Sequence, residues 1–149
     1  MEDQEEGAIR RIKFSVSSRL EEVSLVGLAV RGICASVPLN EAEASQMEIC
    51  VVEVVTNAIK HSYHLQPGHN VDITILLYPD RIEFVVGNTG EPMREEKASR
   101  MDFDPQDVQA LPEGGMGLHI VKSVMDELIY QSIDGVNTFR MSKRFPETG

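Results

Sequence analysis

The stretch PEGGMGLHIV, residues 112–121, places three glycines directly before an apolar run that is typical of a buried helix. Glycine destabilises a helix interior, so Gly114, Gly115 and Gly117 need another explanation. Glycines leave backbone N–H groups uncovered, and a helix N-terminus carries about half a positive charge together with unpaired donors. This combination suits a bound phosphate. A flexible loop before an ordinary helix is the alternative, and the stretch alone does not decide between the two.

The composition limits the kind of ligand this chain can bind. Its 149 residues are enough for one domain with a substantial core. The 14 basic and 24 acidic residues give a formal net charge of −10, which argues against binding nucleic acid through bulk electrostatics. A polyanionic ligand would therefore need local donors and a metal ion.

The two cysteines and the hydropathy indicate the compartment. Cys34 and Cys50 lie in apolar helical patterns without metal-ligand spacing, which favours two buried free thiols in a reducing environment. The sequence shows no signal peptide and no run of about 18 apolar residues. We therefore expect a cytoplasmic protein with no membrane partner.

The first half of the chain predicts one strand, two helices and a hairpin. Residues 1–10 form an acidic tail that we expect to be disordered, and the alternation that follows in RRIKFSV predicts a strand. Apolar residues at helical spacing predict helices over 19–36 and 41–62, the second capped by Asn40. Alternation over 71–77 and 82–86, on both sides of YPDR, predicts the hairpin.

The second half begins with a long aperiodic segment. Between Gly87 and Glu113 the sequence holds three prolines and many charges, and a segment of this length is usually functional or disordered. A helix is expected from Met116, and a last hairpin over 128–145 turns near Asp-Gly. Residues 1–149 thus predict a single α/β two-layer sandwich, with a mixed, mostly antiparallel sheet and three helices on one face.

Three polar residues recur along the second predicted helix. At 100° per residue, Glu53, Asn57 and His61 lie at about 0°, 40° and 80°, along one edge of an apolar stripe centred near 140°. A solvated helix edge commonly carries such residues. The alternative is a chemical site, in which a carboxylate general base lies beside an amide oxygen that binds a hard cation.

These residues belong to a set of motifs that resembles a known family. The segment EVVTNAIKH, residues 53–61, resembles the N-box of the ATPase superfamily named for gyrase, the heat-shock chaperone, histidine kinases and MutL. GNTG at 87–90 resembles its first glycine box, and GGMGLHIV at 114–121 its second. The motifs occur in the family's order, so the resemblance covers residues 11–144. Within the superfamily the chain is most similar to the anti-sigma factor serine/threonine kinases.

The resemblance implies a fold, an activity and a set of partners. The fold would be a Bergerat ATP-binding sandwich with residues 88–116 as the ATP lid region. The activity would be Mg²⁺- and ATP-dependent phosphorylation of a serine or threonine on a small antagonist of the STAS type, releasing ADP. The protein would also sequester a sigma factor, and the first strand and helix could build a homodimer.

The resemblance also assigns roles to individual residues. Asn57 would hold Mg²⁺ through its carbonyl oxygen, and Glu53 would accept the proton of the attacking hydroxyl. Asn88 and Gly90 would belong to the adenine pocket. The phosphates would rest on the second glycine box, formed by Gly114, Gly115, Gly117 and Leu118.

Two positions depart from the family pattern, which is usually written D-x-G-x-G. Asn88 replaces the aspartate that accepts the adenine amino hydrogen, and Pro92 replaces the second glycine. Asn88 keeps one acceptor oxygen without the charge, and Pro92 stiffens the entry to the lid. Two alternatives to the kinase therefore stay open. The chain could be a binding module of the same fold with weak or absent nucleotide binding, or the kinase-like domain of a larger regulator.

Overall fold

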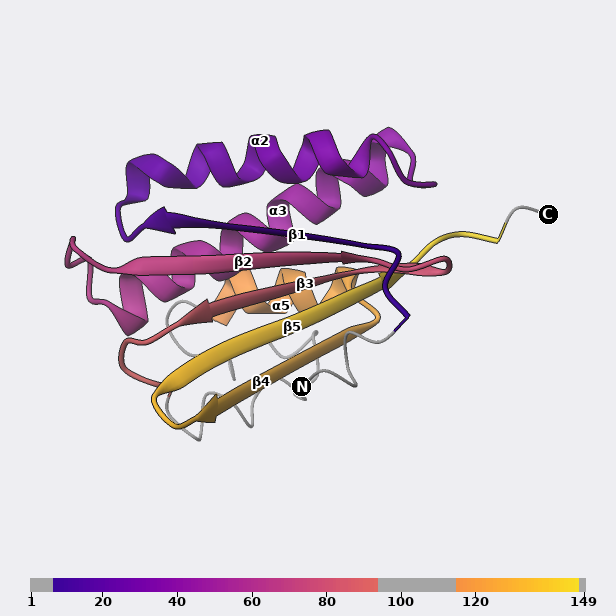
Figure 1. The fold of residues 1–149 in the computed structure, drawn as a ribbon. Coiled ribbons are helices and arrows are strands. Elements are labelled where there is room, and N and C mark those ends of the chain that lie inside the picture. The colour runs from indigo at the N-terminus through magenta and orange to yellow at the C-terminus, as the bar shows by residue number, and fades with distance from the viewer. Residues whose placement is uncertain (1–6, 94–114, 148–149) are drawn as a thin grey trace.

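The apolar faces of the strands and the apolar stripes of the helices are buried against each other, which stacks the elements in two layers. The structure is a computed structural model that describes residues 7–93 and 115–147. Figure 1 shows a single sheet with the helices on one of its faces. In chain order the elements are β1 (Arg10–Ser17), the 3₁₀ turn η1 (Leu20–Glu22), α2 (Val23–Cys34), α3 (Glu41–Asn57), the π-helical segment η2 (Ala58–Ser62), β2 (Asn70–Leu77), β3 (Arg81–Asn88), α5 (Gly115–Val124), β4 (Glu127–Ile133) and β5 (Val136–Arg144). The predicted sandwich with three helices on one face is confirmed.

The five strands lie in the order β1-β2-β3-β5-β4. Every pairing is antiparallel, whereas the sequence predicted a mixed, mostly antiparallel sheet. The reason is the path of the chain. Helices α2 and α3 carry it across the sheet and back, so β2 runs opposite to β1. Strand β4 has the same direction as β3, but β5 lies between them and removes the parallel pair. Strand β1 lies at the sheet margin.

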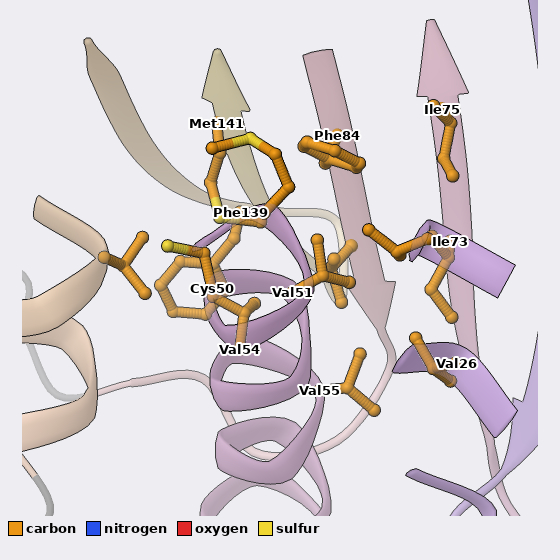
Figure 2. Packing of buried hydrophobic residues seen from close by; sticks show 14 of the residues in the cluster. Val26, Cys50, Val51, Val54, Val55, Ile73, Ile75, Phe84, Phe139 and Met141 are labelled. Atoms are coloured by element: carbon orange, nitrogen blue, oxygen red, sulfur yellow. The ribbon is translucent and has the colours of Figure 1, made fainter. Parts of the chain in front are cut away.

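The core lies between the sheet and α3. Register places Phe84 opposite Met141 and Val86 opposite Phe139 on the face that carries the helices. Figure 2 shows Phe84, Phe139 and Met141 beside the apolar stripe of α3, which includes Cys50, Val51 and Val54. All of these residues are at least 98% buried. Both cysteines are free and buried, as the sequence predicted.

The helix boundaries differ from the prediction at two points. The helix expected over 19–36 begins with the η1 turn because Arg19 is extended and provides no side-chain cap. The helix expected over 41–62 is α-helical only to Asn57 and then widens into η2. Its start is as predicted, since the Asn40 side chain accepts a hydrogen bond from the Glu43 amide at 2.8 Å in a capping box.

The last hairpin turns as its sequence predicts. Asp134 and Gly135 have φ angles of 53° and 80°, the left-handed pair that a two-residue type I′ turn requires. Within the described ranges, no helix has both the length and the apolar character needed to cross a bilayer.

Candidate functional site

Four element ends meet at one end of the sandwich. Asn57 ends α3, Asn88 ends β3, and Asn88 pairs with Asn137 at the start of β5. The C-terminus of α5 is held at the opposite end of the sheet, because Lys143 Nζ donates to the Val124 carbonyl at 3.1 Å. A helix of 10 residues spans about 15 Å, so the N-terminus of α5 extends toward the Asn88 end.

A network of side-chain amides joins β3 to the β4–β5 hairpin. The Asn88 oxygen Oδ1 accepts from the Gly90 backbone N–H at 2.9 Å and from Asn137 Nδ2 at 2.9 Å. Asn137 Nδ2 also donates to the Gly90 carbonyl at 3.0 Å, and the Ser132 hydroxyl donates to Asn137 Oδ1 at 2.7 Å. Asn88 and Asn137 are 3% and 1% exposed. The two amides are buried, Ser132 is exposed, and the network fixes the segment that follows β3.

The orientation of both amides follows from backbone groups. The Gly90 N–H can only donate, so the atom of Asn88 that it contacts is the oxygen. The Gly90 carbonyl can only accept, so the atom of Asn137 beside it is the nitrogen. The Asn88 oxygen therefore already accepts two hydrogen bonds within the protein.

Gly90 lies directly against the end of the N-box helix. A Cβ at this position would be 2.7 Å from the Ser62 carbonyl carbon and 2.8 Å from Tyr63 Cδ1. The close approach lets the Glu91 amide donate to the Ser62 carbonyl at 2.8 Å, and the Thr89 amide to the Tyr63 hydroxyl at 2.9 Å. The widened η2 turn thus docks the first glycine box onto the second predicted helix. This contact is a packing reason for glycine, in addition to the cofactor role expected for it.

Glu53 and Asn57 lie one turn apart on α3 and are both half-buried. In the described part of the chain, neither side chain forms a hydrogen bond or an ion pair. Burial raises the pKa of the Cys50 thiol to about 12. The nearby Glu53 carboxylate adds to this rise, and Lys143 acts in the opposite direction. The spacing thus places these two polar groups on one edge of the helix, and their role as ligand-binding groups stays a prediction. His61, on the same edge, is exposed.

The second glycine box begins α5. The helix starts at Gly115, includes Gly117 in its first turn, and places Leu118 half-buried against the core. The first four N–H groups of any α-helix lack an intrahelical partner, so this terminus provides donors in a row. Gly114 and residues 94–113, which make up most of the expected lid, lie outside the described residues.

Asn137 and Ser132 were not among the site residues predicted from the sequence. A signal was present, because Asn137 is a polar residue at a position whose neighbours on the same face of β5, Phe139 and Met141, are apolar. A polar side chain at an inward strand position needs a buried partner. Nothing in the sequence identifies Asn88 as that partner, because the two residues are 49 positions apart.

The chain is similar in sequence to known proteins. Residues 16–143 match the model of the histidine kinase-like ATPase domain family. The serine-protein kinase RsbW of Bacillus pumilus is 30% identical over 138 residues, which cover 89% of this chain and 84% of the relative. The Bacillus subtilis RsbW is 29% identical over 136 residues, with the same coverage.

Two solved structures share the fold. A chain of the SiaB–SiaC complex from Pseudomonas aeruginosa aligns with a TM-score of 0.62 at 13% identity, over 96% of this chain and 92% of that chain. The mycobacterial sensor histidine kinase MprB aligns with a TM-score of 0.55 at 20% identity, over 89% of this chain and 97% of that chain. At these identities the likeness supports the fold alone.

Proposed function

This chain belongs to the histidine kinase-like ATPase domain family, and we propose that it is a Mg²⁺- and ATP-dependent serine/threonine protein kinase that also acts as an anti-sigma factor. Its substrate would be a STAS-type antagonist and its second partner a sigma factor, in a cytoplasmic setting. The observation that carries the kinase proposal is the pair of half-buried side chains Glu53 and Asn57, which have no partner among the described residues. They lie at the end of the sandwich toward which the N-terminus of α5 points. Homology to the RsbW serine-protein kinases supports the same activity.

The residues present fit a magnesium nucleotide. Among the described residues there is no group of three His, Cys, Asp or Glu side chains that could hold a metal alone. Mg²⁺ in nucleotide sites needs few protein ligands, because phosphates and water complete its coordination. Asn57 provides one neutral oxygen, and the backbone donors of Gly115, Gly117 and Leu118 would bind the phosphates. When bound, the metal ion would neutralise charge on the phosphate oxygens.

Glu53 would accept the proton of the attacking hydroxyl. In the proposed transfer, the oxygen of a substrate serine bonds to the γ-phosphorus, the bond from that phosphorus to the β-γ bridging oxygen breaks, and ADP leaves. The proton of the serine hydroxyl moves to a Glu53 carboxylate oxygen. Phosphoryl transfer has a loose transition state, so positioning contributes more than the base does.

The exposed side of α2 supports a protein partner. Its exposed residues are Ser24, Leu25, Leu28 and Gly32, and none of them is charged. Leu25 and Leu28 are 55% and 67% exposed, and exposed apolar patches commonly mark interaction sites. Because β1 is an edge strand, this side of the molecule is also where we propose that a homodimer forms.

One observation favours a second function, a binding module without catalysis. The Asn88 oxygen is fully used by Gly90 and Asn137, so position 88 offers neither a charge nor a free acceptor to adenine. Weak ATP binding would leave the fold available for partner sequestration alone.

The kinase proposal is tested by Glu53→Gln and Asn57→Ala, with Glu48→Gln as a matched control. Glu48 lies on the same helix but pairs with Arg31 at 3.3 Å, on the side of α2. Single-turnover transfer from ATP to a STAS-domain antagonist should fall about 10²- to 10⁴-fold in Glu53→Gln, with ATP binding retained. Asn57→Ala should abolish the Mg²⁺ dependence of ATP binding in isothermal titration. A wild-type transfer rate in Glu53→Gln would remove this residue from the mechanism.

A further inference from the structure

The β4–β5 hairpin controls the direction of the Asn88 amide. Asn137 Nδ2 donates to both Asn88 Oδ1 and the Gly90 carbonyl, and the Ser132 hydroxyl holds Asn137 Oδ1 from the other side. Each amide contacts a Gly90 backbone group whose role is fixed, the N–H for Asn88 and the carbonyl for Asn137. Rotating Asn88 by half a turn would place its NH₂ group against two donors, the Gly90 N–H and Asn137 Nδ2.

The second polar atom of the Asn88 side-chain amide is its nitrogen, Nδ2. Because Oδ1 is turned toward Asn137 and Gly90, Nδ2 is turned away from both residues. Within residues 7–93 and 115–147, Nδ2 donates to no protein group, and it is not among the buried side-chain atoms that lack a partner. Asn88 is 3% exposed, so Nδ2 is an almost buried donor that is not fully enclosed by the protein, at the end of β3 beside the segment that docks on the N-box helix.

We propose that Asn137 is a positioning residue for base selectivity, and that the site which it organises accepts a 6-oxopurine nucleotide at least as well as ATP. The inference rests on the proposed nucleotide site. Fixed by Asn137, Asn88 presents an N–H donor where a carboxylate would present an acceptor. The exocyclic amino group of adenine is itself a donor and leaves this N–H unpaired, whereas the O6 oxygen of guanine accepts it.

The main test replaces the side-chain nitrogen of Asn88 with an oxygen. Asn88→Asp retains both acceptor contacts, to the Gly90 N–H and to Asn137 Nδ2, and turns the outward donor into an acceptor. Asn40→Asp is the matched control, because it makes the same change of charge at a helix cap, where aspartate is equally favoured. Affinities for ATP, GTP and inorganic tripolyphosphate are measured in Mg²⁺ by isothermal titration. Tripolyphosphate reports on the phosphate site without a base.

We expect the natural protein to bind GTP at least as tightly as ATP. Asn88→Asp should shift the ratio toward ATP by at least about tenfold, because an unmatched buried donor is replaced by a charge-assisted hydrogen bond. Asn40→Asp should leave the ratio unchanged. Tripolyphosphate affinity should be the same in all three proteins.

Asn137→Ala separates positioning from a merely structural role. Loss of the Asn137 donor should loosen Asn88 and bring the ATP-to-GTP affinity ratio closer to one. A structural residue would instead lower both affinities together. Ser132→Ala removes only the outermost hydrogen bond and should move the ratio in the same direction by less, which provides a readout if Asn137→Ala does not fold.

Two results would overturn the inference in different ways. The role of Asn88 and Asn137 would be refuted if the natural protein preferred ATP over GTP tenfold or more, or if Asn88→Asp left the ATP-to-GTP affinity ratio unchanged. In either case, binding of tripolyphosphate would leave the proposed nucleotide site in place. Absence of binding by ATP, GTP and tripolyphosphate alike would refute the proposed function, and the inference with it.

Discussion

Replacing Gly90 with alanine tests whether the first glycine box must touch the N-box helix. The added methyl group would be 2.7 Å from the Ser62 carbonyl carbon and 2.8 Å from Tyr63 Cδ1, and closer still to the Ser62 oxygen. An ordinary contact begins at 3.4 Å, so the two segments must separate by at least about 0.7 Å. Neither neighbour can yield easily, because one is backbone and Tyr63 is 5% exposed.

The energetic cost follows from the contacts that such a shift would break. The Glu91 N–H lies 2.8 Å from the Ser62 carbonyl, and a separation of that size takes the pair beyond hydrogen-bond range. The 3.0 Å contact from Asn137 Nδ2 to the Gly90 carbonyl would lengthen as well. Each hydrogen bond contributes about 1 kcal/mol, and residual strain adds to this, so we expect a loss of about 2–3 kcal/mol.

Gly87 is a matched control in β3, the strand that ends two residues before Gly90. A Cβ there would meet the Asn137 carbonyl oxygen and Thr138 Cγ2 at 3.8 Å, an ordinary distance. Gly87→Ala should therefore change the free energy of unfolding by less than about 0.5 kcal/mol, or stabilise the protein through its unfolded state. Urea unfolding of both variants measures the difference. If Gly90→Ala lies within about 0.5 kcal/mol of Gly87→Ala, the close approach does not constrain the site.

Three further predictions concern other parts of the molecule. Asn40→Ala should lower the free energy of unfolding by about 1 kcal/mol in urea, because the Glu43 amide loses its cap at 2.8 Å, and nucleotide affinity should be unchanged. Burial raises the pKa of Cys34 to about 11 and, with a smaller effect of Glu53, that of Cys50 to about 12. Above about pH 9 the unfolded thiols lose protons that the folded protein keeps, so stability should fall from pH 9 toward pH 11 by up to about 1.4 kcal/mol per pH unit for each thiol. A Cys34→Ala, Cys50→Ala double variant with an equally steep stability profile would exclude the thiols as the cause. Leu28→Glu should convert the proposed dimer to a monomer in analytical sedimentation without changing nucleotide affinity, and a natural protein that is monomeric at tens of micromolar would refute the dimer itself.

The sequence predicted the order and type of the elements because their signals are local. Apolar spacing over 41–62, alternation over 71–77 and the Asp-Gly turn each depend on neighbours within one element. The same locality explains the edge residues of α3, since Glu53 and Asn57 share a face through helical spacing alone. The η2 turn was not predictable in this way. It is the segment against which Gly90 packs, a contact between parts of the chain about 28 residues apart.

The candidate site at Asn88 likewise has some features that the sequence predicts and others that only the tertiary structure decides. The residues that the motifs identified, Glu53, Asn57, Asn88 and the glycines of α5, could be named from spacing and resemblance, and so could the loss of a negative charge at position 88. The direction of the Asn88 amide could not, because it depends on Asn137 and Ser132, which approach it only when β5 is inserted between β3 and β4. A hydrogen bond acts over about 3 Å and depends on which atom donates. Periodicity places a side chain on a face, but the atom that this side chain presents to a ligand is decided by neighbours that only the folded sheet brings within that distance.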